Sequence, residues 1–479
     1  MTVVSGWRPA PKSVANALWA IALLTAAGLS WLVPALQSPD EGSHINRAYM
    51  ISRGELLLQP IPERLPEQKE NAEIAASMES ARHTGGRSGG YIDQGLLAFS
   101  EHQMVLVEKA DKRLSAVELE YLSALTWRGT ARYHPLPGTG YYFPAVYAPQ
   151  AVGLAVGQLL DLTIVQSYQL MRALTLFACF ALLWLGFKLL LPNPLVAAIL
   201  MLPMSLFQMV SPTIDGLTTS LAILTVSLFL SSVDYRRQHT QTASWSLALC
   251  IFLLATSRIH LLPLLSLPFF LAWQRQTRRD FYLGCLIAVA TLAWLFFALQ
   301  TTNDPRVVRN HTTTQLLIGY AIDPLSFFKI FVASVADDES FTFYQQSFIG
   351  ILGWLDTPLA WYVYPTLWTG LALCTLASVS VSTLHGDWGA RLLLVAVAVA
   401  SIGMIFLAML VTWTPHPASV VKGVQGRYFV VPAVMLSYAA SGYVTQQPPI
   451  RRWVAGLAVS VFALASLTAL TMSLWSRYH

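Results

Sequence analysis

The sequence is dominated by long apolar runs, and the short stretches between them hold many of its basic residues. One helix needs about 20 apolar residues to cross a bilayer, and several runs reach or approach that length. Only 11% of the 479 residues are charged, whereas a soluble domain carries about 25%. The net charge of +5 is scattered in small clusters, so no nucleic-acid partner is expected. We therefore expect a multi-pass membrane protein rather than a soluble enzyme or a disordered scaffold.

The acidic residues are concentrated in one segment, which predicts its location. Residues 37–142 hold 14 of the 25 acidic and 11 of the 30 basic residues, so this segment lies outside the bilayer. Elsewhere the basic residues form short, acid-poor clusters: Arg8 with Lys12, Arg236 with Arg237, Arg275 with Arg278 and Arg279, Arg391, and Arg451 with Arg452. Because short basic loops stay in the cytoplasm, we expect a cytoplasmic N-terminus and an extracytoplasmic first loop over residues 37–142.

This orientation predicts an all-α, polytopic membrane protein with about eleven transmembrane helices in one integral domain, residues 1–479. The expected spans are Val14–Leu36, Tyr168–Leu191, Leu195–Val210, Leu217–Val233, Ser244–Thr256, Ile259–Trp273, Phe281–Leu299, Pro358–Leu384, Leu392–Trp413, Phe429–Val444 and Trp453–Trp475. Residues 143–165 are interpreted as a re-entrant or interfacial helix, because a further span would place Arg236 and Arg237 outside; whether they cross the membrane is left open. Residues 300–346 and 414–428 form further outer loops.

The first candidate site follows the first span, where Asp40, Glu41 and His44 lie at the level of the lipid headgroups. A carboxylate there can act as a general base, or can help to hold a divalent cation. The same residues also fit a helix N-terminus, with Ser38 as the cap, Pro39 at the first position and the acids in the first turn. Taken alone, the pattern favours the helix cap, and the two interpretations are compatible.

Three cations are candidates for binding a phosphate. Arg258 lies between two short spans, where it can bind a phosphate, pair with an acid such as Asp215, or extend to the surface. Lys422 and Arg427 flank two glycines whose backbone N–H groups can form an anion cradle. The alternative for this last segment is an interface anchor with Tyr428 in the aromatic belt.

The remaining candidates have simple structural alternatives. Asp215 fits a cap on the helix that follows it, with a smaller chance of reaching the site. Trp354 and Asp356 suit either a sugar-stacking surface or an interfacial turn. The four cysteines all fall in predicted spans and none has a CxxC partner, so a Cys-ligated metal is not expected.

Taken together, the motifs resemble a large family of bacterial multi-pass membrane proteins of formerly unknown function, related to the GT-C superfamily of glycosyltransferases. The resemblance extends from Pro39 to about Pro432. It rests on Pro39-Asp40-Glu41 with His44, Tyr147-Ala148-Pro149-Gln150 with Gly153, Arg172, Pro203 with Ser211 and Asp215, Phe348-Ile349-Gly350 with Gly353-Trp354 and Asp356, and Gln425-Gly426-Arg427-Tyr428-Phe429 with Pro432.

The resemblance implies an all-helical fold whose first outer loop carries helices parallel to the membrane. It also implies transfer of a sugar from a polyprenyl-phosphate donor on the outer face of the bacterial cytoplasmic (inner) membrane. The acceptor is then a hydroxyl of a cell-envelope glycan, lipid or protein. An acid in the first loop activates that acceptor in the superfamily, so Asp40 or Glu41 is the catalytic candidate. The resemblance points to no certain cofactor, and because only some members of the superfamily use a divalent cation, that use is left open.

Charge chemistry adds roles to the other residues. Arg258, Lys422 and Arg427 would bind the donor phosphate, whose negative charge grows as it leaves. The expected substrate-binding residues are His44, Tyr147, Gln150, Asp215, Trp354, Asp356, Gln425 and Tyr428. Two other functions remain open, namely a flippase or transporter of a lipid-linked or anionic substrate, and a glycan polymerase or ligase.

Overall fold

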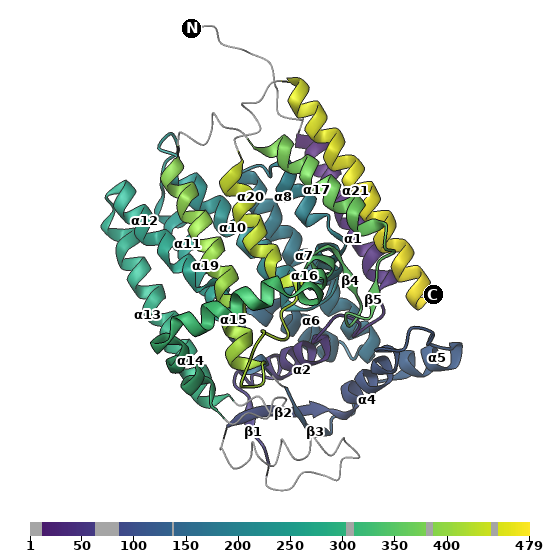
Figure 1. Cartoon of the computed structure of the whole chain (residues 1–479). Coiled ribbons are helices and arrows are strands. Elements are labelled where there is room, and N and C mark those ends of the chain that lie inside the picture. The colour runs from purple at the N-terminus through teal and green to yellow at the C-terminus, as the bar shows by residue number, and fades with distance from the viewer. Residues whose placement is uncertain (1–11, 63–85, 137, 303–310, 380–386, 442–448) are drawn as a thin grey trace.

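The computed structural model describes residues 12–62, 86–136, 138–302, 311–379, 387–441 and 449–479. The chain is mostly helical, as expected. Its longer helices are α1 (Lys12–Leu32), α7 (Ile164–Leu189), α10 (Ile214–Val233), α11 (Gln241–Ser257), α13 (Arg278–Thr301), α17 (Val363–Ser378), α19 (Trp388–Thr412), α20 (Val430–Ala440) and α21 (Pro449–Tyr478). They pack side by side as a bundle, with α1 and α21 along one edge (Figure 1).

Within the described residues, five helices are long and apolar enough to cross a membrane, namely α7, α10, α13, α19 and α21. A sixth results if α14 (Thr313–Ile322) and α15 (Pro324–Ala336), which are bent by 101°, count as one span. The multi-pass expectation is therefore confirmed at this level, and the total of eleven crossings stays a prediction.

Several expected spans are shorter or interrupted in the structure. The run Leu195–Val210 is divided into α8 (Pro194–Leu200) and α9 (Pro203–Val210), because Pro203 lacks the N–H that would continue the first helix. The run Ile259–Trp273 consists of the 3₁₀ helix η4 (Ile259–Leu265) followed by α12 (Ser266–Arg275). Residues 143–165 contain η3 (Pro144–Tyr147) and α6 (Ala148–Leu159), and a helix of 12 residues is too short to cross a bilayer.

Helix α10 is the central helix of the bundle. Within its most apolar 18-residue window, 94% is buried inside the protein. The corresponding share is 22–44% in the other four helices that are long enough to cross a membrane. It packs against α7, α11 and α20. Such complete burial places both of its ends inside the protein, and Asp215 lies in its first turn.

Most of the predicted cytoplasmic clusters meet at one end of the bundle, which we call the basic end (Arg237, Arg275, Arg391 and Arg451). Each guanidinium donates to backbone carbonyls at the ends of neighbouring helices, Arg391 to Tyr438, Ala439 and Ser441 and Arg275 to Ser232 and Asp234. Helix C-termini attract cations in this way. Arg8 and the Lys12 side chain fall outside the described residues.

The described parts of residues 37–142, the predicted first loop, lie at the opposite end and contain helices together with a small sheet (Figure 1). Its helices are α2 (Glu41–Ser52), α4 (Gln94–Gln103) and α5 (Ala116–Ala124), with the short 3₁₀ helices η1 (Met104–Leu106) and η2 (Thr139–Tyr141). Strands β1 (Gln59–Pro60), β2 (Arg87–Asp93) and β3 (Ala131–Pro135) pair antiparallel in the order β1-β2-β3.

The sheet makes the strictly all-α prediction wrong. Gly89 and Gly90 in β2 gave no strand signal, because glycine is depleted in strands. The structure requires Gly89, since a Cβ there would collide with the His134 carbonyl oxygen, and it places Gly90 against the end of the Met50 side chain. A second pair, β4 (Ile351–Leu352) and β5 (Thr357–Pro358), forms a hairpin just before α17.

The predicted second loop, residues 300–346, is helical in its described part. After α14 and α15 comes α16 (Asp338–Ile349), and Asp323 and Asp337 cap α15 and α16 by accepting from backbone N–H groups. The inner faces of these helices share a hydrophobic cluster with α19 and residues 418–429. In the predicted third loop, residues 414–428, the 3₁₀ helix η5 (Gly426–Phe429) leads directly into α20.

Candidate functional site

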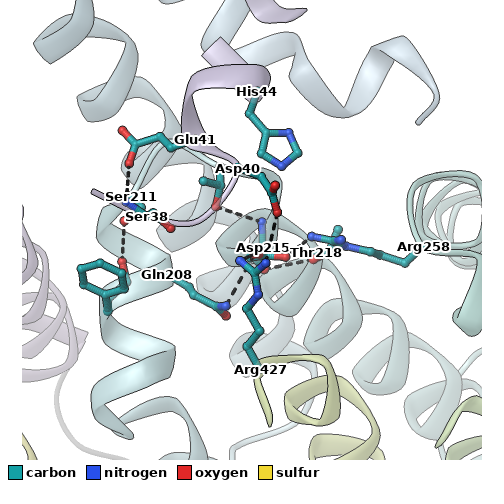
Figure 2. A network of polar contacts seen from close by, with 12 residues as sticks. Ser38, Asp40, Glu41, His44, Gln208, Ser211, Asp215, Thr218, Arg258 and Arg427 are labelled. Atoms are coloured by element: carbon teal, nitrogen blue, oxygen red, sulfur yellow. Dashed lines mark hydrogen bonds and ion pairs between the residues drawn. The ribbon is translucent and has the colours of Figure 1, made fainter. Parts of the chain in front are cut away.

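Two aspartates and two arginines form a continuous ion-pair network at the end of the bundle opposite the basic end. Arg427 donates from Nη2 to Asp40 Oδ2 and from Nη1 to Asp215 Oδ2, both at 3.2 Å. Arg258 donates from Nη2 to Asp215 Oδ1. Figure 2 shows Asp215 between the two guanidinium groups. We call Asp40, Asp215, Arg258 and Arg427 the four-residue network.

Exposure within the network is uneven. The side chain of Asp40 is 44% exposed, whereas those of Asp215, Arg258 and Arg427 are 11%, 14% and 4% exposed. Asp40 is therefore the most accessible member of the network. Burial would lower the pKa of Arg427, but Tyr428 and Asp40 outweigh it and raise that pKa, so its guanidinium stays charged.

The helix cap at the start of α2 differs from the expectation. Asp40, not Ser38, is the N-cap residue, with φ +62° and no side-chain capping bond. Asp and Asn tolerate this left-handed conformation better than other side chains. The carboxylate does not cap the helix and instead accepts from Arg427.

Glu41 points away from Asp40 and has a different environment (Figure 2). It is fully buried and accepts from Leu36 N at 3.1 Å, Ser38 N at 3.0 Å and Tyr168 Oη at 2.7 Å. Burial raises its pKa, against the attraction of Arg172. These bonds hold the chain between α1 and α2 in place, so Glu41 positions Asp40.

Asp215 also has a role that differs from the expected cap. Thr213 caps α10 by accepting from Asp215 N, which leaves the Asp215 carboxylate for Arg258 and Arg427. The pairing of Arg258 with Asp215, which was one alternative for that arginine, is confirmed. Gln208 donates to the same carboxylate at 3.5 Å.

His44 lies next to the network on the following turn of α2. Its Nδ1 is hydrogen-bonded to Tyr147 Oη at 2.8 Å, and its ring stacks on Tyr142 at 5.9 Å. The Arg258 guanidinium lies 5.5 Å from the centre of the Tyr142 ring. Tyr142 therefore joins His44 to Arg258. Tyr147 is fully buried, and burial raises the pKa of its hydroxyl well above the usual value.

Other predicted residues contact backbone rather than the network. Gln150 donates to the carbonyls of Pro212 and Thr213, just before α10. Trp354 donates to the Leu36 carbonyl at 2.8 Å. Both contacts fix segments that carry network residues.

Asp356 belongs to a different group of side chains. It accepts from Glu108 N at 2.9 Å, Thr357 Oγ1 at 3.0 Å and Arg477 Nη2 at 3.4 Å. It lines a pocket of about 500 Å³ with Arg113 and Tyr362, between the first loop and the end of α21.

The proposed anion cradle is largely occupied by the protein itself. Gly426 N donates to Ser347 Oγ, Lys422 N to Thr414 Oγ1 and Tyr428 N to the Gln425 carbonyl. Lys422 is exposed. The segment therefore contributes chiefly through the Arg427 side chain, with Tyr428 against that guanidinium at 5.3 Å.

Two buried atoms beside the network have no hydrogen-bond partner among the described residues. They are Arg427 Nε, a donor, and Gln425 Oε1, an acceptor. Buried polar groups are seldom left unpaired, so a donor and an acceptor remain available beside the network. The sequence gave no sign of the contacts made by Tyr142, Tyr168 and Gln208.

A metal does not fit the residues present. Asp40 and Asp215 are bonded to arginines, and the described part of the chain contains no group of three or more His, Cys, Asp or Glu side chains able to hold an ion.

Comparison with known families places these residues in a wider context. The family described as "Predicted membrane protein (DUF2142)" matches residues 23–436, which include the whole four-residue network. The chain belongs to this family. No curated protein matches the chain.

Proposed function

We propose that this protein is a membrane glycosyltransferase that transfers a sugar from a polyprenyl-phosphate donor to an acceptor hydroxyl on the extracytoplasmic face. The observation that carries this proposal is the four-residue network, in which a reachable carboxylate lies beside two guanidinium groups. Acceptor activation needs a base, and a departing phosphate needs cations. The network supplies both.

The base in this proposal is Asp40. Its 44% exposure allows an acceptor hydroxyl to approach, while Arg427 fixes the orientation of the carboxylate. As the hydroxyl oxygen attacks the anomeric carbon, its proton passes to Asp40 and the bond to the donor phosphate breaks. Direct attack inverts the anomeric configuration.

The phosphate site in this proposal is formed by Arg258 and Arg427. Arginine has five N–H donors, and Arg258 and Arg427 each use only some of them to bind aspartates. The unpaired Nε–H of Arg427 can donate to a phosphate oxygen, and Gln425 Oε1 can accept from a sugar hydroxyl. Asp215 holds the two guanidinium groups at one place before the donor arrives.

The proposed orientation agrees with the distribution of charge. Arg237, Arg275, Arg391 and Arg451 gather at the end opposite the network, as expected if the basic clusters face the cytoplasm. The network then faces the extracytoplasmic side of the bacterial cytoplasmic membrane.

The test is an assay of purified protein in nanodiscs with a polyprenyl-phosphate sugar whose sugar is labelled. We expect release of polyprenyl phosphate together with a new glycosidic bond to an acceptor. In sealed vesicles, movement of the intact donor across the bilayer with no bond formed would contradict the proposal and support a flippase. Transfer of whole preassembled glycans alone would instead support a polymerase or ligase.

A further inference from the structure

A second site lies on the surface of the bundle, between α17 and α21. It is a groove of about 590 Å³ whose walls are almost entirely apolar. Phe462 packs against Gly370, where a Cβ would come within 2.6 Å of the ring, and this contact closes the floor of the groove. Leu373, Leu376 and Leu457 are exposed along its walls.

The length of the groove matches one leaflet of a bilayer. On α17 it extends from Thr366 to Ala377, and on α21 from Arg451 to Ala465. At 1.5 Å per residue the wall is about 17 Å long on α17 and about 21 Å long on α21. The hydrocarbon core is about 30 Å thick, so the groove covers between about half and two-thirds of it.

A cationic side chain, that of Arg451, lies at one end of this groove. Arg451 lines it and donates from Nη2 to the carbonyl oxygens of Leu376 and Val379. A guanidinium has five N–H donors, and the two carbonyls engage only Nη2. The next residue, Arg452, adds a second positive charge at the same end.

Arg451 is at the basic end, far from the four-residue network. Arg427 precedes α20, whereas Arg451 follows it and contacts Val379, whose backbone pairs with Ser441 just after α20. The groove and its cation therefore belong to the other leaflet from the proposed donor phosphate, so the polyprenyl donor is not its occupant.

We propose that this groove binds an anionic phospholipid, with one acyl chain between α17 and α21 and the phosphate held by Arg451. The largely apolar walls favour an acyl chain, and the two adjacent arginines at headgroup level, Arg451 and Arg452, favour a negatively charged headgroup. Basic sites between transmembrane helices on the cytoplasmic side bind anionic headgroups in this way. The lipid would hold α21 against α17. The protein itself buries only 22% of the most apolar window of α21.

The experiment is native mass spectrometry of the full chain, purified in detergent and titrated with phosphatidylglycerol or phosphatidylcholine of the same acyl chains. We expect the first lipid bound to be phosphatidylglycerol. Arg451→Gln should weaken its binding about tenfold, the value of one charge-assisted hydrogen bond, and leave phosphatidylcholine unchanged. The matched control is Arg236→Gln, which removes an exposed positive charge near the same end without touching the groove.

Two further variants test the groove itself. Ala377→Phe and Ala458→Phe fill it from opposite walls and should each weaken phosphatidylglycerol binding, with thermal unfolding confirming that the variants are folded. Equal affinity of the wild type for both lipids would overturn the proposal. So would undiminished phosphatidylglycerol binding in Arg451→Gln or in both filled variants, or equally tight binding of glycerol phosphate without acyl chains.

Discussion

Arg427 and Asp215 are 212 positions apart in the sequence, yet Arg427 Nη1 lies 3.2 Å from Asp215 Oδ2. Both side chains are largely buried, and each has a second ionic partner, Asp40 for the arginine and Arg258 for the aspartate. This contact joins the start of α2, the start of α10 and the segment before α20. The loss of one member should therefore affect the others.

Asp40→Asn should reduce sugar transfer by about 10²- to 10⁴-fold, the usual contribution of a general base. Asparagine keeps the shape, tolerates φ +62° and still accepts a bond from Arg427, so folding should be preserved. Initial rates with labelled donor would measure this. Asp161→Asn is a matched control, because Asp161 is exposed and also has a positive φ of 51°. Wild-type turnover in Asp40→Asn would remove Asp40 from the proposed role.

Arg258→Ala should weaken donor binding about 10- to 100-fold, because a charge-assisted hydrogen bond to the phosphate is lost. Arg258→Lys should retain most of the affinity, since Arg258 reaches Asp215 through Nη2 alone and lysine keeps the charge. Binding of a fluorescent polyprenyl-phosphate sugar in nanodiscs measures both. Lys109→Ala removes an exposed charge from the first loop and should have little effect; equal losses in Lys109→Ala and Arg258→Ala would point to a diffuse charge effect instead.

Arg427→Met should lower the free energy of unfolding by about 3 kcal/mol, the lower end of the range for a broken buried ion pair, because Asp215 loses Arg427 and keeps Arg258. The stability of Arg427→Lys should lie between those of Arg427→Met and the wild type. One ammonium group cannot bind Asp40 and Asp215 as the two Nη groups of arginine do. Thermal or denaturant unfolding in detergent would measure the change. Arg236→Met, at an exposed position, should change the stability by less than about 0.5 kcal/mol. A similar small change in Arg427→Met would show that the network is not structural.

The stability difference between wild type and Glu41→Gln should depend on pH. Burial raises the pKa of Glu41 above its ordinary value of 4.5 in the folded state. Between pH 4.5 and the higher pKa of Glu41 in the folded state, the folded chain binds more protons than the unfolded chain. The contribution of Glu41 to stability therefore falls as the pH rises through this range. Its contribution is complete below pH 4.5.

Unfolding of both proteins between pH 4 and pH 8 tests this, because glutamine does not titrate. The advantage of the wild type over Glu41→Gln should increase as the pH is lowered. An advantage that stays constant, or that shrinks toward low pH, would mean that the carboxylate is no harder to ionise in the fold than in the unfolded chain.

Much of the architecture was predictable because it follows from local composition. The apolar runs predicted a multi-pass helical protein, and the acid-poor basic clusters predicted residues that meet at one end. The strands of the first loop were not predictable, since β2 and β3 pair across some 40 residues and β2 contains two glycines. The break at Pro203 shortened one predicted span for a reason visible in the sequence.

The candidate site was predictable as a set of residue types but not as an arrangement. Asp40, Asp215, Arg258 and Arg427 were all selected from the sequence, and the structure brings them together. Asp40 and Glu41 are adjacent, and the family resemblance made either one the candidate for the catalytic acid. Only the fold shows that Glu41 turns inward to three hydrogen-bond donors while Asp40 stays reachable.

The scarcity of charge and its uneven distribution therefore determined, from the sequence alone, that lipid is the solvent and which loops are basic. Those properties depend on the transfer of individual residues between water and hydrocarbon, so neighbours along the chain suffice to predict them. The partner of each charged side chain was decided by tertiary structure. A buried ion pair depends on the positions of helix ends hundreds of residues apart, and packing around α10 sets those positions.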